Sequence, residues 1–173
     1  MKTSFFNTLS LWVLPGLIAG VVFLAIAMGS GALSTTAWAM PDAIAQVLGI
    51  AAPTEYSFAP VPVLVGVAVH LAFSIVLGIM LVAFARGLRL HGWMLVVGAV
   101  ILVTIETPIA LWVVMHNLLP STTFTYYLAA VPLWGSLLGH YMYALTLGLL
   151  LARNPLTATW KLQRPASRLG TRG

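Results

Sequence analysis

Long apolar runs alternate with short polar segments along the chain, and four of the runs are long enough to cross a lipid bilayer. A bilayer core needs about 20 apolar residues in an α-helix. The four runs cover residues 9–28, 61–85, 93–115 and 128–152. A lone helix satisfies its own backbone hydrogen bonds in lipid, whereas the strands of a barrel would alternate polar and apolar residues. We therefore predict an all-α fold, a four-helix transmembrane bundle.

Proline positions and the length of the first run refine these spans. Pro62 and Pro132 lie near the starts of the second and fourth runs and suit the first turn of a helix, where the missing N–H costs nothing. The first run resembles a signal peptide, because Lys2 precedes it and Ala37-Trp38-Ala39 looks like a cleavage site. An apolar run of about 20 residues is longer than the usual stretch of about 7 to 15, so we expect a retained span.

Composition agrees with a membrane protein and removes several function classes. Hydrophobic residues make up 61% of the chain and charged residues only 6%, against roughly 25% charged in a soluble domain. The sequence contains no cysteine, which excludes disulfides and thiolate sites. It also lacks a glycine-rich phosphate loop, and no acid is placed to complete a serine triad. We expect no nucleic-acid partner, since the cations do not gather beside a soluble core.

The distribution of cations predicts the orientation. All eight lie on one side of the predicted membrane, at Lys2, Arg86, Arg89, Arg153, Lys161, Arg164, Arg168 and Arg172. The positive-inside rule makes that side cytoplasmic, so we predict a bacterial inner-membrane protein with both termini in the cytoplasm. We divide the chain into one transmembrane domain, residues 1–153, and a basic, flexible cytoplasmic tail, residues 154–173, held near anionic headgroups.

The first outer loop contains a candidate short helix at residues 41–50. Ile44, Val47 and Leu48 share one helical face, and Gly49 is a plausible stop. Two interpretations are open, an interfacial helix lying on the membrane and a loop packed on the bundle.

Two helices carry the same four-residue pattern at an offset of 70 residues. One row is Gly66, His70, Ser74 and Gly78, and the other is Ser136, His140, Ala144 and Gly148. Each row lies on one helical stripe, because residues four apart share a face. The pattern predicts a parallel duplication of helix pairs, and its small residues also suit close helix packing.

Ionisable residues inside the spans are predicted to share one level. From the 1.5 Å rise per residue, His70, His140 and Glu106 all lie roughly 12 to 13 Å below the outer edge, where the first helix offers Phe23 to Ala25. A charged side chain facing lipid is costly, so Glu106 should face the bundle. Pro108 frees a carbonyl, and Thr104 and Thr107 can bond backbone groups around a local kink.

Four interpretations of this level are open. The first is structural, with the histidines and Glu106 linking helices by hydrogen bonds. The second is a b-type haem with His70 and His140 as axial ligands. The third is a metal ion held by His70, His140 and Glu106. The fourth is a path for a proton or a small solute.

The sequence also resembles a known family. The features are Gly16 to Gly20 in the first helix, the outer Ala-Gln-Val-Leu-Gly stretch, His70 with Gly78, a proline beyond the middle of the third helix, and Leu138-Gly139-His140-Tyr141 leading to Gly148. Together they resemble the uncharacterised YagU-like four-helix bacterial inner-membrane proteins over most of the chain up to Arg153. The resemblance implies a four-helix inner-membrane fold and supplies no reaction. Glu106 before Thr107-Pro108 departs from the family pattern.

The function expected from these observations is that of a non-enzymatic accessory or interaction subunit of a larger inner-membrane assembly, in contact with lipid and with other subunits or copies. The alternative is a haem-binding electron-transfer subunit. Outer aromatic residues are the candidate contacts, although such residues commonly anchor helices at the interface. They are Trp38, Phe58, Phe124, Tyr126 and Tyr127.

Overall fold

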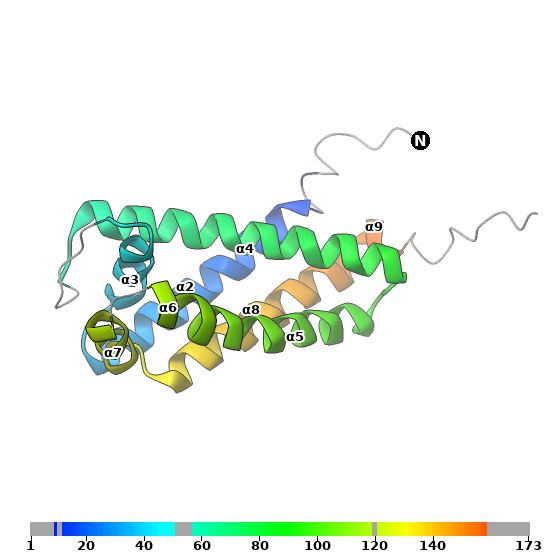
Figure 1. Ribbon diagram of the computed structural model, residues 1–173. Helices are drawn as coiled ribbons and strands as arrows, with labels where there is room; N and C mark the ends of the chain where they lie inside the picture. Colours follow the sequence, from blue (N-terminus) through cyan, green and yellow to red (C-terminus); the bar gives the residue numbers. More distant parts are fainter. Residues whose placement is uncertain (1–8, 10–11, 51–56, 119–120, 159–173) are drawn as a thin grey trace, which may run out of the picture.

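The computed structural model describes residues 9, 12–50, 57–118 and 121–158, and within them every regular element is a helix (Figure 1). Four helical stretches are long and apolar enough to cross a membrane. They are α2 (Leu14–Ser34), α4 (Pro60–Leu88), the continuous run Trp93–Leu118, and α8 (Leu133–Arg153). The predictions of an all-helical chain and of four apolar spans are confirmed.

The first helix is shifted relative to the predicted 9–28, because it begins and ends later, and the second extends beyond the predicted 61–85 at both ends. Helix α2 begins at Leu14, with a proline in its first turn, and continues through the small polar residues to Ser34. Ser30 and Ser34 donate their hydroxyls to backbone carbonyls three and four residues earlier, so these polar side chains are satisfied inside the helix. Helix α4 ends in a left-handed cap at Arg89.

The third span is one helix whose hydrogen-bond pattern changes at Pro108. Helix α5 (Trp93–Pro108) continues as the π-helix η1 (Ile109–Met115) and then as α6 (His116–Leu118), past the predicted end at residue 115. Thr104 and Thr107 donate their hydroxyls to the carbonyls four residues earlier, both at 2.8 Å, so the predicted bonds to backbone groups are present. Proline has no N–H to continue the α pattern, and the wider π turn absorbs the loss.

The predicted fourth span, residues 128–152, is divided in two. Helix α7 (Ser121–Ala130) ends before Val131, and α8 begins at Leu133. A residue before proline avoids the helical conformation, and Pro132 itself is extended, with ψ of 142°. Pro132 therefore precedes the helix instead of lying in its first turn.

The long helices do not enclose one another evenly. Helix α2 packs on α4 and α8, and α8 packs also on α5, whereas α4 and α5 make few contacts. At one end of the molecule α3, α6 and α7 gather, and the other end holds the α4–α5 connection and α9 (Figure 1). The side between α4 and α5 is consequently left open.

Helix α3 (Ala39–Val47) lies in the predicted outer loop and begins before the predicted 41–50. It ends near the predicted stop, with Gly49 in the left-handed region at φ 76°. It packs against α4 and buries Ala39, Met40 and Asp42. Of the two open interpretations, the structure favours a segment packed on the other helices.

Two further predictions differ from the structure. Phe124 and Tyr127, expected as exposed outer contacts, are buried, whereas Phe58 is exposed and Trp38 is half-buried. The side chain of Tyr126 lies outside the described residues. The predicted tail begins with the short helix α9 (Pro155–Ala158), and residues 159–173 also lie outside the described part.

Candidate functional site

A cavity of about 280 Å³ lies between the helices, and His70, Glu106 and His140 all line it. They come from α4, α5 and α8 respectively. Helix α2 adds Phe23, and the rest of the lining is mainly apolar. The structure therefore brings together the three residues for which helix arithmetic predicts a common depth.

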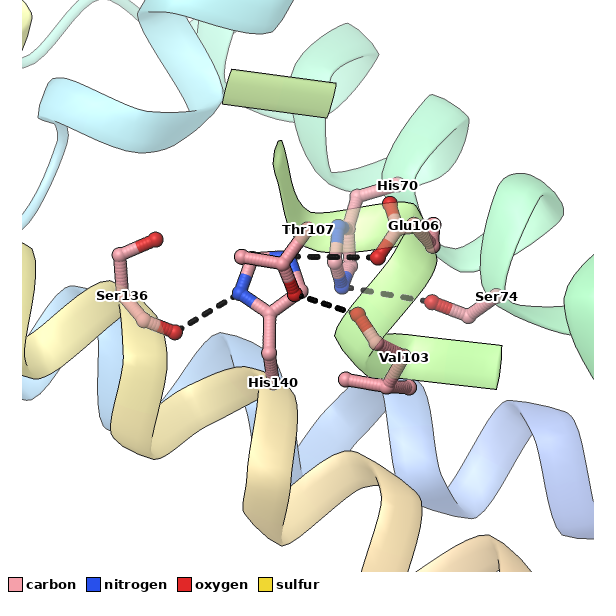
Figure 2. Close-up of polar contacts among 7 residues, drawn as sticks. All are labelled: His70, Ser74, Val103, Glu106, Thr107, Ser136 and His140. Carbon is pink, nitrogen blue, oxygen red and sulfur yellow. Dashed lines mark hydrogen bonds and ion pairs between the residues drawn. The ribbon is translucent and has the colours of Figure 1, made fainter. Parts of the chain in front are cut away.

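The imidazole of His140 is held between a backbone carbonyl and a carboxylate (Figure 2). Its Nδ1 lies 2.8 Å from the carbonyl oxygen of Ser136, and its Nε2 lies 3.6 Å from Oε2 of Glu106. Because a carbonyl only accepts, Nδ1 carries a hydrogen. A neutral ring then presents its Nε2 lone pair to Glu106. A single proton shared by the two side chains gives either a protonated Glu106 beside a neutral His140, or a carboxylate beside an imidazolium.

His70 is placed by contacts on two helices. Its Nε2 shares a hydrogen bond of 3.4 Å with the Ser74 hydroxyl one turn along α4, and the ring also lies near the backbone of Gly20 on α2. Figure 2 shows the His70–Ser74 contact beside the His140–Glu106 pair. His70 therefore has its own partners, and Glu106 pairs with the other histidine.

The ring of Phe23 contacts both histidines. It stacks on His70, with ring centres 4.7 Å apart and planes at 27°, and meets His140 edge-on at 4.6 Å. This aromatic ring from α2 fixes the positions of two imidazoles from different helices.

The six small residues of the two predicted stripes are all buried: Gly66, Ser74, Gly78, Ser136, Ala144 and Gly148. A side chain at Gly78 would meet the Cα of Gly16 at 2.9 Å, and one at Gly148 would meet the Cα of Val96 at 2.6 Å. Gly66 lies against the carbonyl of Pro41. The stripes are therefore where α4 and α8 approach neighbouring backbones most closely.

Sequence reasoning missed two tyrosines in the cavity lining, Tyr127 and Tyr143. The Tyr143 hydroxyl donates a hydrogen bond of 2.7 Å to the carbonyl of Ser74, which links α8 to α4. Tyr143 is three residues after His140, so helical spacing could have indicated it. No local signal places Tyr127 here, because α7 is a separate helix.

Among the residues that the structure describes, no three His, Asp or Glu side chains are grouped so that they could hold a metal ion. His116, near the end of the third span, is exposed and packs edge-on against Phe124 at 5.0 Å.

Comparison with known proteins adds no relative to this picture. No protein-family model, curated protein or solved structure matches the chain. The resemblance to the YagU-like proteins stays a prediction, and functional argument has to rest on the geometry.

Proposed function

We propose that this chain is a small, non-enzymatic integral membrane protein that holds a small ligand between its helices at the level of His70, Glu106 and His140. The observation that carries the proposal is one cavity where polar groups from three helices converge in an otherwise apolar lining. Ligand sites typically have this composition. A volume of about 280 Å³ suits one ring-sized molecule or several waters.

The inner half of the molecule favours ligand binding over conduction of a proton or solute. A proton or solute path would need further polar groups between Glu106 and the cytoplasmic ends. Most of the large side chains that are fully buried there are apolar, such as Leu81, Leu95, Leu147 and Leu151. The buried hydroxyl of Thr157, at the far end, already bonds backbone carbonyls. Among the described residues, buried polar side chains therefore do not continue in a row from this level toward the cytoplasmic ends.

Binding is also favoured over acyl transfer. At the described cavity, the Ser74 hydroxyl shares a hydrogen bond with His70, but the carboxylate of Glu106 pairs with His140. A serine nucleophile needs its own histidine to be oriented by a third group, commonly a carboxylate. This pair lacks that carboxylate.

A b-type haem bound by His70 and His140 is the alternative proposal, since both imidazoles line one cavity. The Phe23 ring touches both of them and would have to move for a porphyrin to enter. Absorption spectra of protein from haem-replete membranes test this alternative. A Soret band lost in both H70A and H140A would favour haem over the small-ligand proposal.

The small-ligand proposal is tested by extracting protein gently purified from its native membrane and analysing the extract by mass spectrometry. We expect a compound at about one per chain in the wild type. Filling the cavity with Ala110→Phe should remove it, whereas Leu145→Phe, on an exposed position of α8, should not. The absence of any such compound, or equal retention in both variants, would contradict the proposal.

We also propose that the protein acts as an accessory subunit or homo-oligomer in a bacterial inner membrane, with both termini cytoplasmic. Support comes from the one-sided cations and from the short segments outside the long helices. Gentle detergent extraction followed by native mass spectrometry tests it. A monodisperse single chain without a companion would count against the accessory role.

A duplication of helix pairs is proposed as the origin of the two stripes. Gly78 of α4 meets the backbone of α2, the preceding long helix, and Gly148 of α8 meets the backbone of α5, again the preceding long helix. The two pairs are joined unevenly, because α2 packs on α8 while α4 and α5 diverge.

A further inference from the structure

A second cavity, of about 620 Å³, follows the first along α4 and α5. Its lining is apolar throughout and begins about one turn beyond the polar site, since Met80 succeeds Leu77 on α4 and Ile105 precedes Glu106 on α5. It ends near Leu88 and Trp93, where the two helices are connected. We call this second cavity the α4–α5 groove.

The polar site is open toward the same side. Phe73 of α4 and Ile109 of η1 line it and are about half exposed. Met40 and Ile44 of α3 and Tyr127 of α7 line it from the outer end of the molecule. A molecule dissolved in the membrane could thus enter between α4 and α5 without crossing the outer end.

We propose that the ligand is a neutral amphiphile with a hydrogen-bonding ring and a long apolar tail, the chemistry of an isoprenoid quinone. The ring would lie beside Glu106 and His140, and the tail would lie in the α4–α5 groove. This inference rests on the proposed function and specifies its ligand class. It concerns binding alone and includes no redox step.

The neutral, hydrogen-bonding head group of the ligand is inferred from the charges at the site. The Glu106–His140 contact can donate or accept a proton, which suits carbonyl or hydroxyl oxygens on a ring. An anionic head would be repelled by an ionised Glu106, and a phospholipid keeps its charged head at the membrane surface, roughly 12 Å above this level. A neutral ring meets neither obstacle.

The apolar tail of the ligand is inferred from the shape and polarity of the groove. Twelve residues of α4, α5 and their connection line it, and none of them carries a charge. A large side chain introduced at Gly98 would block the groove. The backbone tolerates it there, because a Cβ would meet only the side-chain ends of Leu90 and Leu81. Gly87 lies on α4 with open space around it and gives a matched control.

The experiment is a titration of the full chain in phosphatidylcholine nanodiscs with three probes: decylubiquinone, the same quinone ring without its tail, and decylbenzene. We expect decylubiquinone to bind at one per chain and decylbenzene to compete weakly. Gly98→Phe should weaken decylubiquinone by at least about tenfold, which corresponds to 1.4 kcal/mol, and leave the tailless ring unchanged. Gly87→Phe should change neither.

The head contact is tested separately with Glu106→Leu, which should weaken the tailed and the tailless quinone together. If this variant does not fold, the infrared carbonyl band of decylubiquinone bound to the wild type supplies the measurement. Hydrogen bonding at the site should lower its frequency relative to free quinone in lipid. An unshifted band would overturn the placement of the ring.

Other outcomes separate this inference from the proposed function. Equal binding of the tailless ring and of decylubiquinone, with no effect of Gly98→Phe, would overturn the tail in the groove but leave a ligand cavity. Decylbenzene binding as tightly as decylubiquinone would show an apolar groove filled by any chain and overturn the quinone. Binding of no quinone would overturn the ligand class, while the mass-spectrometric extraction decides the cavity proposal independently.

Discussion

Asp42 on α3 is fully buried, and neither carboxyl oxygen has a hydrogen-bond partner among the residues described. Burial raises the pKa of Asp42 from its ordinary 3.8 to about 6. The folded state therefore holds this proton more tightly than the unfolded state does. The contribution of Asp42 to stability is greatest below the pKa that its carboxyl has in the unfolded state. Stability decreases as the pH rises from about 4 to about 6 and stays reduced above pH 6.

Replacing Asp42 by Asn should remove this penalty. At pH 8 we expect the free energy of unfolding to rise by on the order of 1 to 3 kcal/mol, because an amide does not ionise. The variant should also lose the decline between about pH 4 and pH 6. Thermal unfolding in detergent across that range measures both effects, and a parallel curve for wild type and variant would contradict the assigned cause.

Tyr143 gives a second test at the residue scale. Tyr143→Phe removes the hydroxyl that bonds the Ser74 carbonyl at 2.7 Å and should lower the free energy of unfolding by about 1 kcal/mol. Tyr141→Phe is the matched control, since Tyr141 lies on the same helix with its side chain exposed. Unfolding by denaturing detergent compares the two, and equal stabilities would mean that the bond contributes nothing net.

At the scale of elements, close approach of helix backbones holds the molecule together. Gly16 and Gly78 lie where α2 crosses α4, and Gly148 lies where α8 meets α5. Small residues permit such contacts, which supply van der Waals packing where the lipid offers no hydrophobic driving force between helices.

Alanine substitution at these glycines should separate the helices. Gly78→Ala and Gly148→Ala place a Cβ under 3 Å from backbone atoms, so each should cost about 1 to 3 kcal/mol. Gly87→Ala meets open space and should be neutral, or stabilising by up to about 1 kcal/mol through helix propensity. Melting temperatures of the purified variants test the order, and a loss at Gly87 equal to that at Gly78 would exclude packing as the cause.

For the whole molecule, the distribution of charge predicts how the chain sits in the membrane. The native sequence has no cysteine, so single cysteines can report the side. In intact cells, an impermeant thiol reagent should label Ser57→Cys and leave Arg89→Cys unlabelled, because the positive-inside rule keeps the arginine cytoplasmic. Permeabilised cells supply the control for accessibility. The reverse pattern would invert the topology.

Much of this architecture could be predicted from local pattern alone. The four apolar spans, the short helix α3 before Gly49 and the hydrogen bonds of Thr104 and Thr107 follow from hydropathy, backbone conformation and short-range bonding. The convergence of His70, Glu106 and His140 on one cavity agrees with the common depth that the helical rise predicts for them. Each of these properties depends on residues a few positions apart.

Other features depend on contacts between distant segments. The sequence did not predict that the fourth helical run is interrupted before Pro132, that Tyr127 lines the cavity, or that Asp42 is buried. The pairing of Glu106 with His140, the insertion of Phe23 between two imidazoles and the open side between α4 and α5 likewise come from how the helices pack. Helical periodicity gives each helix its faces and depths, whereas the choice of which faces meet is made by side-chain shapes in three dimensions.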